Sequence, residues 1–263
     1  MKLTRLSQKE QWESRWSNVR KQRLAFDPKQ PLFRETHKLL QNYLPCDSGR
    51  RFLEVGAYPG KYLWYFHRYY GYEPWGIEYV ESCAEKAKEL LRNENVPANI
   101  IAKDFFDFSH SDYGDEHGWD VVASFGFVEH FDQPEIAVSR HLEVARPDGY
   151  VVVSVPNHAG WNGNIMKVVD KNKWSQHNRM NLPDLVRAFE VTGGNQVLFA
   201  GHVGHLGFWN TCLYETAKSK LGALYPLVRA PLSIAEHLGS KIVPNNGLTS
   251  PELVVIAQKS TAQ

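Results

Sequence analysis

Three features are scarce in this 263-residue sequence, and each scarcity argues against a class of protein. The three cysteines lie far apart without a CxxC pair, which argues against a disulfide framework or a cysteine metal site. No run of about 18 apolar residues occurs, so no membrane span is expected. Lys plus Arg (30) nearly balance Asp plus Glu (29), so no overall positive field supports a nucleic-acid partner.

The remaining composition is that of a packed globular protein, with 43% hydrophobic and 22% charged residues. The N-terminal segment MKLTRLSQKEQWESRW lacks the apolar stretch of a signal peptide, so we expect a cytoplasmic protein. No repeat or low-complexity linker divides the chain, and no signal indicates its oligomeric state. We therefore expect a single domain over residues 1–263.

Short apolar runs alternate with helical segments from residue 51 onward, which is the pattern of parallel βαβ units. The expected strands are 51–55, 74–78, 98–102, 119–124, 149–155, 196–200 and 252–258. The expected helices between them are 61–70, 80–93, 134–145 and 182–192. This order predicts an α/β fold with a Rossmann-like, doubly wound, seven-stranded and mostly parallel sheet.

Segments outside this alternation are expected to surround the sheet. Trp12 and Trp16 lie four residues apart, which would place both indoles on one face of an N-terminal helix. The expected parts are an N-terminal helical cap (1–48, with a second helix at 31–44), a cofactor-binding core (49–200), and insertions (156–181 and 211–242). Long insertions in compact domains are usually lids or interfaces, so we expect these two to cover the acceptor site.

The strongest functional signal is a strand and glycine turn, LEVGAYPG (residues 53–60), followed by the expected helix at 61–70. Glycines allow a sharp turn and a close approach to a ligand, and a helix N-terminus presents free N–H groups. Glu78 ends the second strand 22 residues after Gly56, where a doubly wound fold places an acceptor for ribose hydroxyls. The pair indicates an adenosine site.

The turn reads ExGxYxG and lacks the GxGxxG of nicotinamide-dependent dehydrogenases. It resembles motif I, (D/E)xGxGxG, of class I S-adenosylmethionine-dependent methyltransferases, with Tyr58 at the usual middle glycine. The resemblance continues in register over about residues 50–200. Asp104-Phe105 follows the third strand, FVEHF (127–131) resembles the EH segment of small-molecule enzymes such as those of ubiquinone biosynthesis, and RPDGYVVV (146–153) resembles their RxLKPGG turn.

The resemblance implies S-adenosyl-L-methionine as cofactor and assigns parts of it to residues at successive strand ends. Glu54 would orient the ammonium group, Glu78 would bind the ribose, and Asp104 would receive the adenine amino group. Ser124 and Phe125 would border the methionyl moiety. The full set of expected cofactor-binding residues is Glu54, Gly56, Ala57, Gly60, Glu78, Asp104, Phe105, Ser124 and Phe125.

Methyl transfer from a sulfonium depends mostly on positioning, but a hydroxyl or protonated amine acceptor must also lose a proton. Histidine suits that task near neutral pH, and the expected catalytic residues are His130 and His177. Either side chain could instead make a structural hydrogen bond. His202 and His205 lie in a glycine-rich segment without acidic or cysteine partners, so no metal is expected.

The expected function is transfer of a methyl group to an oxygen or nitrogen of a small-molecule acceptor. Aromatic residues in the connections, Trp161, Trp174, Phe208 and Trp209, either pack beneath the insertions or contact a planar acceptor. Two alternatives remain open at this point. One is a nicotinamide-dependent oxidoreductase, and the other is a catalytically inactive cofactor-binding subunit.

Overall fold

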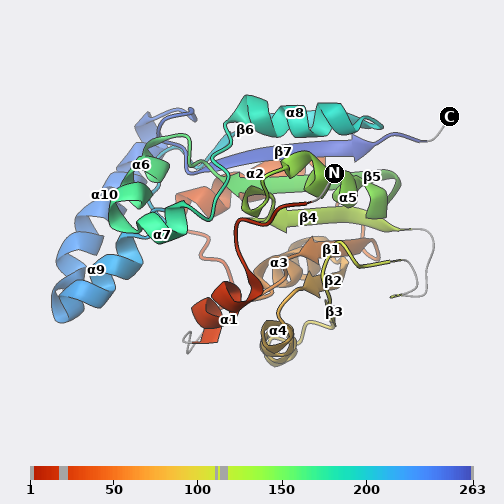
Figure 1. Cartoon of the computed structure of the whole chain (residues 1–263), viewed down its shortest axis with the longest axis horizontal. Helices are drawn as coiled ribbons and strands as arrows, with labels where there is room; N and C mark the ends of the chain where they lie inside the picture. Colours follow the sequence, from red (N-terminus) through yellow and green to blue (C-terminus); the bar gives the residue numbers. More distant parts are fainter. Residues whose placement is uncertain (1–2, 18–22, 110–111, 113–117, 262–263) are drawn as a thin grey trace.

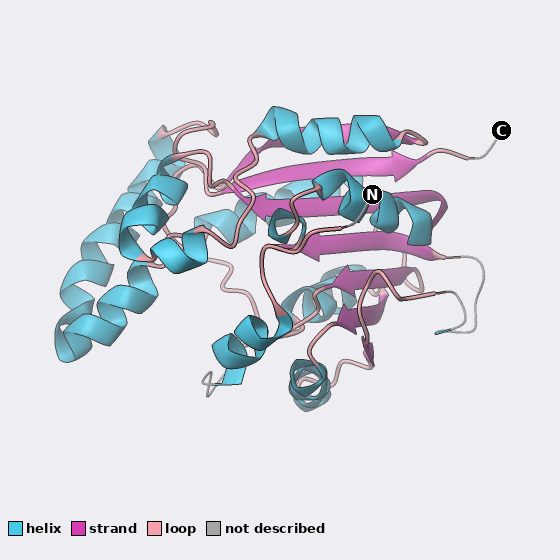
Figure 2. Cartoon of the chain, in the orientation of Figure 1, coloured by secondary structure: helices cyan, strands magenta, loops and turns pink. Residues whose placement is uncertain are grey.

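Seven strands form one sheet at the centre of the molecule, with helices on both of its faces (Figures 1 and 2). The computed structural model describes residues 3–17, 23–109, 112 and 118–261. The strands are β1 (Arg51–Val55), β2 (Glu73–Glu78), β3 (Asn99–Ala102), β4 (Trp119–Phe125), β5 (Ala145–Pro156), β6 (Asn195–Val203) and β7 (Glu252–Lys259). They are ordered β3-β2-β1-β4-β5-β7-β6, and only β7 runs antiparallel to its neighbours. The expected Rossmann-like fold is confirmed.

The helices lie close to their expected positions. They are α1 (Lys9–Ser17), α2 (Pro31–Tyr43), α3 (Lys61–Tyr70), α4 (Glu81–Asn93), α5 (Pro134–Val144), α6 (Trp161–Val169), α7 (Lys171–Trp174), α8 (Leu182–Thr192), α9 (Leu213–Leu221) and α10 (Tyr225–Ile242), with short 3-10 turns η2 (Val128–His130) and η3 (Gly222–Leu224). The strand expected at 149–155 begins earlier, at Ala145, because that residue already pairs with Trp119 before a register shift in the β4–β5 ladder.

The alternating side chains of the strands build two separate cores, one on each face of the sheet. On one face, Val122 and Val153 pack with the α5 and α8 side chains. On the other face, Val121 and Val152 pack with residues of α2, α3 and α4. The period-2 pattern therefore buries both faces, as the apolar runs of a parallel sheet require.

The strand order creates a crevice between the carboxyl ends of β1 and β4. The chain leaves β1 toward β2 on one side and leaves β4 toward β5 on the other side, so the connections diverge at this point. Such a switch point is the general ligand site of open α/β sheets. The fold alone thus places a site beside residues 55–57 and 125–127.

The two insertions form a helical group beyond the carboxyl ends of β4 and β5, at the left of Figure 1. Helices α6 and α7 follow β5, whereas α9, η3 and α10 connect β6 to β7. Among the helices that the structure describes, none combines the length and the apolar character needed to cross a bilayer.

Gly76 of β2 provides a test of how tightly the sheet packs against the glycine turn. A Cβ at this position would lie 2.7 Å from the Ala57 Cβ and 3.1 Å from the Leu63 Cδ1. We expect Gly76→Ala to lower the free energy of unfolding by about 1–3 kcal/mol through overpacking. The measurement is urea denaturation. Ser219→Ala, at an exposed site on α9, serves as the control and should change stability by less than about 0.5 kcal/mol. Equal stability of the two variants would contradict the packing argument.

Candidate active site

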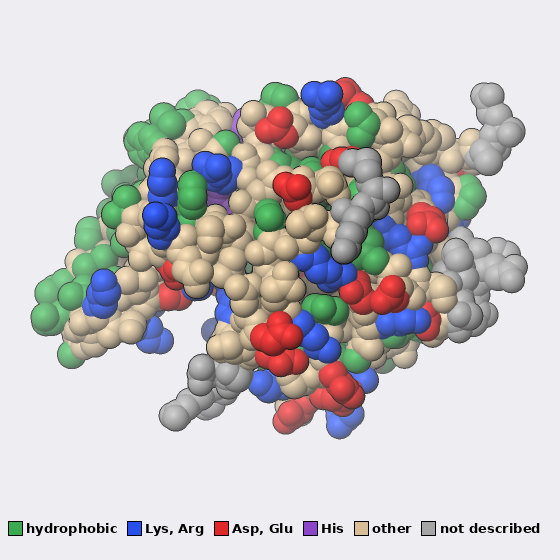
Figure 3. Space-filling view, in the orientation of Figure 1, with side chains coloured by type: hydrophobic (Ala, Val, Ile, Leu, Met, Phe, Trp, Pro, Cys, Tyr) green, Lys and Arg blue, Asp and Glu red, His purple; other side chains and the backbone are tan. Residues whose placement is uncertain are grey.

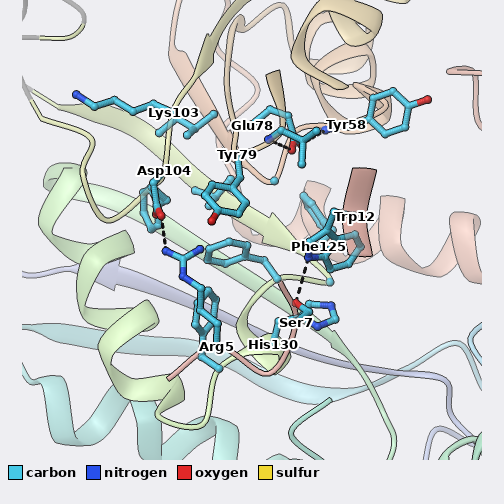
Figure 4. Close-up of a pocket in the computed structure, with 18 of the residues that line it drawn as sticks. Arg5, Ser7, Trp12, Tyr58, Glu78, Tyr79, Lys103, Asp104, Phe125 and His130 are labelled. Carbon is cyan, nitrogen blue, oxygen red and sulfur yellow. Dashed lines mark hydrogen bonds and ion pairs between the residues drawn. The ribbon is translucent and has the colours of Figure 1, made fainter. Parts of the chain in front are cut away.

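A pocket lies at the carboxyl ends of the central strands, where the switch point predicts it (Figure 4). Strand ends and the loops after them form its floor, and the N-terminal segment forms its cover. The lining residues are Arg5, Ser7, Trp12, Trp16, Val55, Gly56, Tyr58, Ile77, Glu78, Tyr79, Val80, Lys103, Asp104, Phe105, Phe125, Gly126, Phe127, His130 and Phe131.

Glu78 holds the glycine turn against the end of β2. Its Oε2 accepts a hydrogen bond from the Tyr58 amide at 3.1 Å, and its Oε1 accepts one from the Val80 amide at 3.0 Å. Burial raises the pKa of this carboxyl group, although both amide bonds oppose the shift. A carboxylate has about four lone-pair positions, so two remain for further donors such as ribose hydroxyls.

The backbone of the turn needs its glycines, but it does not need one at position 58. Gly56 and Gly60 have φ of +75° and +96°, in the left-handed region that other residues rarely adopt. A Cβ on Gly60 would also approach the Leu91 Cδ1 to 2.8 Å. The Tyr58 ring instead packs edge-on against Trp16 of α1, with centroids 5.1 Å apart. Tyr58 therefore supplies a wall of the pocket while its amide serves Glu78.

Asp104 follows β3 and faces the pocket from the opposite wall to Tyr58 (Figure 4). Its Oδ1 accepts from the Phe106 amide at 3.0 Å, and its Oδ2 forms an ion pair with Arg5. The Arg5 guanidinium also lies over the Tyr79 ring, 4.9 Å from the centroid. Arg5 thus occupies the side of the pocket at which the resemblance places adenine.

The N-terminal segment is fixed over the pocket by its backbone. The Leu6 amide donates to the His130 carbonyl at 2.8 Å, and the Asp132 amide donates to the Thr4 carbonyl at 3.1 Å. The Trp12 indole donates to the Ser7 hydroxyl at 3.1 Å and meets the His130 ring edge-on at 4.8 Å (Figure 4). Helix α1 begins only at Lys9; before it, Arg5 forms an isolated β-bridge with Phe131, and residues 6 and 7 form a bend.

The methionyl end of the expected site lies at the end of β4. The Phe125 ring is stacked on Tyr62 of α3, with centroids 3.3 Å apart. Beside it, the buried Ser124 hydroxyl has no hydrogen-bond partner among the described residues. Buried polar atoms are normally paired, so an orphaned hydroxyl at a strand end fits a missing ligand or water.

Glu54 lies behind this end of the pocket and does not line it. Its side chain is buried and accepts a hydrogen bond from the Leu63 amide at 3.2 Å. Burial raises the pKa of Glu54 well above its usual value, and the nearby Glu78 charge adds to the shift. The unliganded site therefore favours a neutral Glu54, and a cation placed nearby would favour its ionised form.

Three histidines meet at the other end of the pocket. The ring centroids of His130 and His177 are 4.6 Å apart, and those of His177 and His158 are 4.7 Å apart. The His130 Nδ1 lies 3.0 Å from the Gln176 carbonyl, and the His177 Nδ1 lies 2.7 Å from the Lys173 carbonyl. Because a carbonyl only accepts, both Nδ1 atoms carry the proton and both Nε2 atoms have a free lone pair.

Burial keeps this histidine group uncharged. Desolvation lowers the pKa of His130 well below its usual value and that of His177 to about 4. The adjacent Glu129 carboxyl, whose Oε1 lies 3.7 Å from the His130 Nε2, has its pKa raised to about 8 by burial. One ligand atom from each of Glu129, His130 and His177 lies within 4.8 Å of the others, a spacing that a divalent cation could accept.

The structure brings together part of the residue set expected from the sequence. Gly56, Glu78, Asp104, Phe105, Phe125 and His130 line the pocket. Glu54, Ala57, Gly60, Ser124 and His177 lie outside its lining, in contact with or behind the lining residues. The lining also leaves out Trp161, Trp174, Phe208 and Trp209. The Trp174 ring instead forms cation–π contacts with Lys167 and Arg179.

Among the residues around the site that sequence reasoning missed are His158, Glu252, Arg5 and Ser7. His158 and Glu252 could have been found from strand ends: His158 follows β5, and Glu252 begins the antiparallel β7, which starts where the parallel strands finish. Glu252 Oε2 accepts from the Ser154 hydroxyl at 2.7 Å, and burial raises its pKa to about 8. Arg5 and Ser7 carry no such signal, because the N-terminal segment reaches the pocket only through tertiary pairing.

The comparison with known families decides between the alternatives. A profile of the methyltransferase domain matches residues 24–193, which is more than half of the chain. The chain belongs to the methyltransferase domain family. The expected enzyme class is thereby confirmed, and the nicotinamide-dependent oxidoreductase and the inactive subunit have no support. A search of curated protein sequences gives no match to this methyltransferase.

Solved structures share the fold of the methyltransferase at low identity. The [4+2]-cyclase SpnF is 13% identical with a TM-score of 0.59, over 86% of the methyltransferase and 80% of the cyclase chain. The geranyl diphosphate C-methyltransferase of Streptomyces coelicolor, solved with Mg²⁺, geranyl diphosphate and S-adenosyl-L-homocysteine, is 13% identical with a TM-score of 0.57, over 86% and 78%. The YjhP protein of E. coli is 18% identical with a TM-score of 0.57, over 93% and 97%.

The role of Glu78 can be tested by a substitution of nearly the same size, which also removes one of the two oxygens that accept backbone amides. Glu78→Gln removes the charge that would accept two ribose hydroxyls, and hydrogen bonds to charged groups contribute about 1.5–3 kcal/mol. We expect an affinity for S-adenosylmethionine that is about 10- to 100-fold weaker by titration calorimetry. Glu73→Gln, at the exposed start of the same strand, is the matched control and should bind normally. Unchanged affinity in Glu78→Gln would contradict the ribose assignment.

Proposed function

We propose that this methyltransferase transfers the methyl group of S-adenosyl-L-methionine to an oxygen or nitrogen of a small-molecule acceptor, and that His130 and His177 take up the acceptor's proton. One observation carries the proposal: a single pocket joins the carboxyl groups of buried Glu78 and half-buried Asp104 at one end to the uncharged His130 at the other. The geranyl diphosphate enzyme, a structural neighbour solved with S-adenosyl-L-homocysteine, supports the choice of cofactor.

The chain's own groups fit such a cofactor at three points. Glu78 retains two acceptor positions beside the glycine turn, Asp104 faces the same space, and the Ser124 hydroxyl lacks a partner among the described residues. When bound, the cofactor supplies a sulfonium methyl group that is already activated for transfer. The residues then need only to hold it in line with the acceptor and to exclude water.

The histidine pair provides the proton acceptor. An acceptor hydroxyl or protonated amine would lose its proton to an imidazole Nε2 when it is methylated. His130 is suited to this step because its Nδ1 is fixed on the Gln176 carbonyl, which leaves Nε2 unprotonated. The imidazolium that results would be stabilised by Glu129, whose Oε1 lies 3.7 Å away.

We propose that this chemistry needs no metal, because Nε2 is available as a base and the donor carries its own activation. We also propose a cytoplasmic location, for which the three free cysteines give support: Cys46 is exposed, and Cys83 and Cys212 are buried.

The experiment is a turnover assay against a panel of small hydroxyl and amine compounds, planar and apolar ones first. Formation of S-adenosyl-L-homocysteine together with a methylated product would establish the reaction and the acceptor atom. Retention of tight cofactor binding without product from any compound would contradict a small-molecule acceptor.

Replacing His130 separates the proton step from cofactor binding. We expect His130→Gln to lower kcat by about 100- to 10,000-fold, the usual contribution of a general base, with little change in cofactor affinity. The measurement is steady-state kinetics with an acceptor found in the panel. His237→Gln, at an exposed site on α10, is the control and should retain full activity.

The pH profile and the effect of a chelator can contradict the proposal that a buried histidine acts as a metal-free base. Since burial lowers the pKa of both histidines, the unprotonated base persists below neutrality, and the acid limb of kcat/KM should lie well below pH 6.5. A limb near 6.5, or activity abolished by EDTA and restored by a divalent cation, would contradict a buried, metal-free histidine base.

Glu54 predicts proton release when the cofactor binds. Burial raises its pKa in the unliganded site, and the cofactor's positive charge would lower that pKa, so binding favours the deprotonated form. Affinity should therefore rise with pH between the bound and free pKa values. Calorimetry at several pH values in buffers of different ionisation enthalpy should detect protons leaving the protein. Glu54→Gln should abolish this release; release that is absent in the wild type would remove Glu54 from the ammonium site.

A further inference from the structure

Helix α10 has one face packed on the domain. Val228, Leu232 and Ala235 are half-buried, and Gly239 is buried against Leu206, where a Cβ would lie 2.7 Å from the Leu206 Cδ2. The Glu236 Oε1 accepts a hydrogen bond from the Phe208 amide at 2.7 Å. These contacts account for the attachment of the helix to the molecule, and they leave the rest of its circumference exposed.

A second, exposed apolar row lies about a quarter turn around the helix from the packed row, and we call it the outer stripe. It consists of Leu227, Pro231, Ile234, Leu238 and Ile242, which recur every three or four residues along the helix. This spacing places them on one side of an α-helix about 27 Å long. The four aliphatic members are between 53% and 79% exposed, and exposed Leu221 and Leu224 continue the apolar surface beyond the start of the helix. Figure 3 shows green side chains gathered along this left edge of the molecule.

Exposed cations also lie on the helices of the two insertions. Lys218, Lys220, Arg229 and Lys241 are exposed on α9 and α10. Residues 161–174 and 213–242, which include these helices together with α6 and α7, contain seven Lys and Arg against three Asp and Glu, a net charge of +4. Because the whole chain has a net charge of +1, the remainder carries −3. The helical group therefore carries the positive charge of the chain: Lys241 lies near the outer stripe, Lys218 and Lys220 lie on the adjoining α9, and Arg229 lies on the other side of α10.

The exposed apolar row and the positive charge together indicate what binds to this surface. A second copy paired antiparallel on the outer stripe would bring like charges together: within residues 213–242, all of which the structure describes, Glu215 is the one fully exposed carboxylate. An anionic bilayer complements both features, since its headgroups attract the cations and its acyl boundary accepts the apolar row. We propose that the outer stripe and its flanking cations dock the enzyme on the surface of an anionic lipid bilayer.

The helix would lie in the plane of the interface, which agrees with the finding that no described helix could cross a bilayer. The docking surface lies beyond the carboxyl ends of β4 and β5, on the same side of the sheet as the pocket (Figure 1). A docked enzyme would therefore hold its pocket next to the interface. This inference does not depend on the identity of the methyl acceptor.

The experiment is flotation of the full chain with vesicles. We expect the protein to float with vesicles of equimolar phosphatidylglycerol and phosphatidylcholine, to bind vesicles of phosphatidylcholine alone at least about 10-fold more weakly, and to dissociate as salt is raised. The variant Leu238→Ser with Ile242→Ser should weaken binding to anionic vesicles by about 10-fold or more, because it removes apolar area from the interface.

Val191→Ser, at an exposed valine on α8, is the matched control and should bind as the wild type does. Thermal melts of each variant check that the fold is retained. Three results would overturn the proposal: no flotation with anionic vesicles, flotation that the stripe variant leaves unchanged, or light scattering that shows a dimer which the stripe variant dissociates. The last result would mean that a second copy covers the stripe.

Discussion

The hydrogen bonds that Glu78 accepts from the Tyr58 and Val80 amides are the interaction on which the site depends. They fix the turn after β1 to the end of β2, and the turn in turn sets where α3 begins. A buried carboxyl group without such donors would be costly, and an amide without an acceptor at this point would be equally so. The geometry of the pocket follows from satisfying both groups at once.

A second constraint is that most of the buried ionisable groups around the pocket are uncharged. Burial raises the pKa of Glu54, Glu129 and Glu252 and lowers that of His130 and His177, so the unliganded site holds mostly neutral groups at neutral pH. A bound cation changes this state at the Glu54 end, and a proton taken up by an imidazole changes it at the Glu129 end. The two ends can therefore respond separately to cofactor and acceptor.

The sequence predicts those parts of the molecule that depend on local periodicity and on the rule that strand ends form sites. The bounds of β1 and α3, the glycine turn and the position of Glu78 all follow from these signals. Arg5 could not be predicted, because it reaches Asp104 only through the bridge between its own backbone and that of Phe131, 126 residues away. Glu129 and His130 are adjacent in sequence, but their proximity to His158 and His177 requires the positions of two later connections.

The buried face of α10 could not be predicted from the sequence in the way that the site could. The outer stripe of α10 has helical periodicity, but periodicity alone does not tell which of the two apolar faces of that helix is buried. Contacts of Gly239 with Leu206 and of Glu236 with the Phe208 amide decide this. The helical insertion therefore combines one face that packs on the domain with one face that is exposed to solvent.

The most direct test of the account is a crystal structure of the full chain with S-adenosyl-L-homocysteine. It predicts ribose hydroxyls on the Glu78 carboxylate, the adenine edge at Asp104 with Arg5 displaced or stacked beside it, and the sulfur directed toward the His130 end of the pocket. A ligand bound elsewhere, or one in this pocket with its adenine at the histidines, would contradict it.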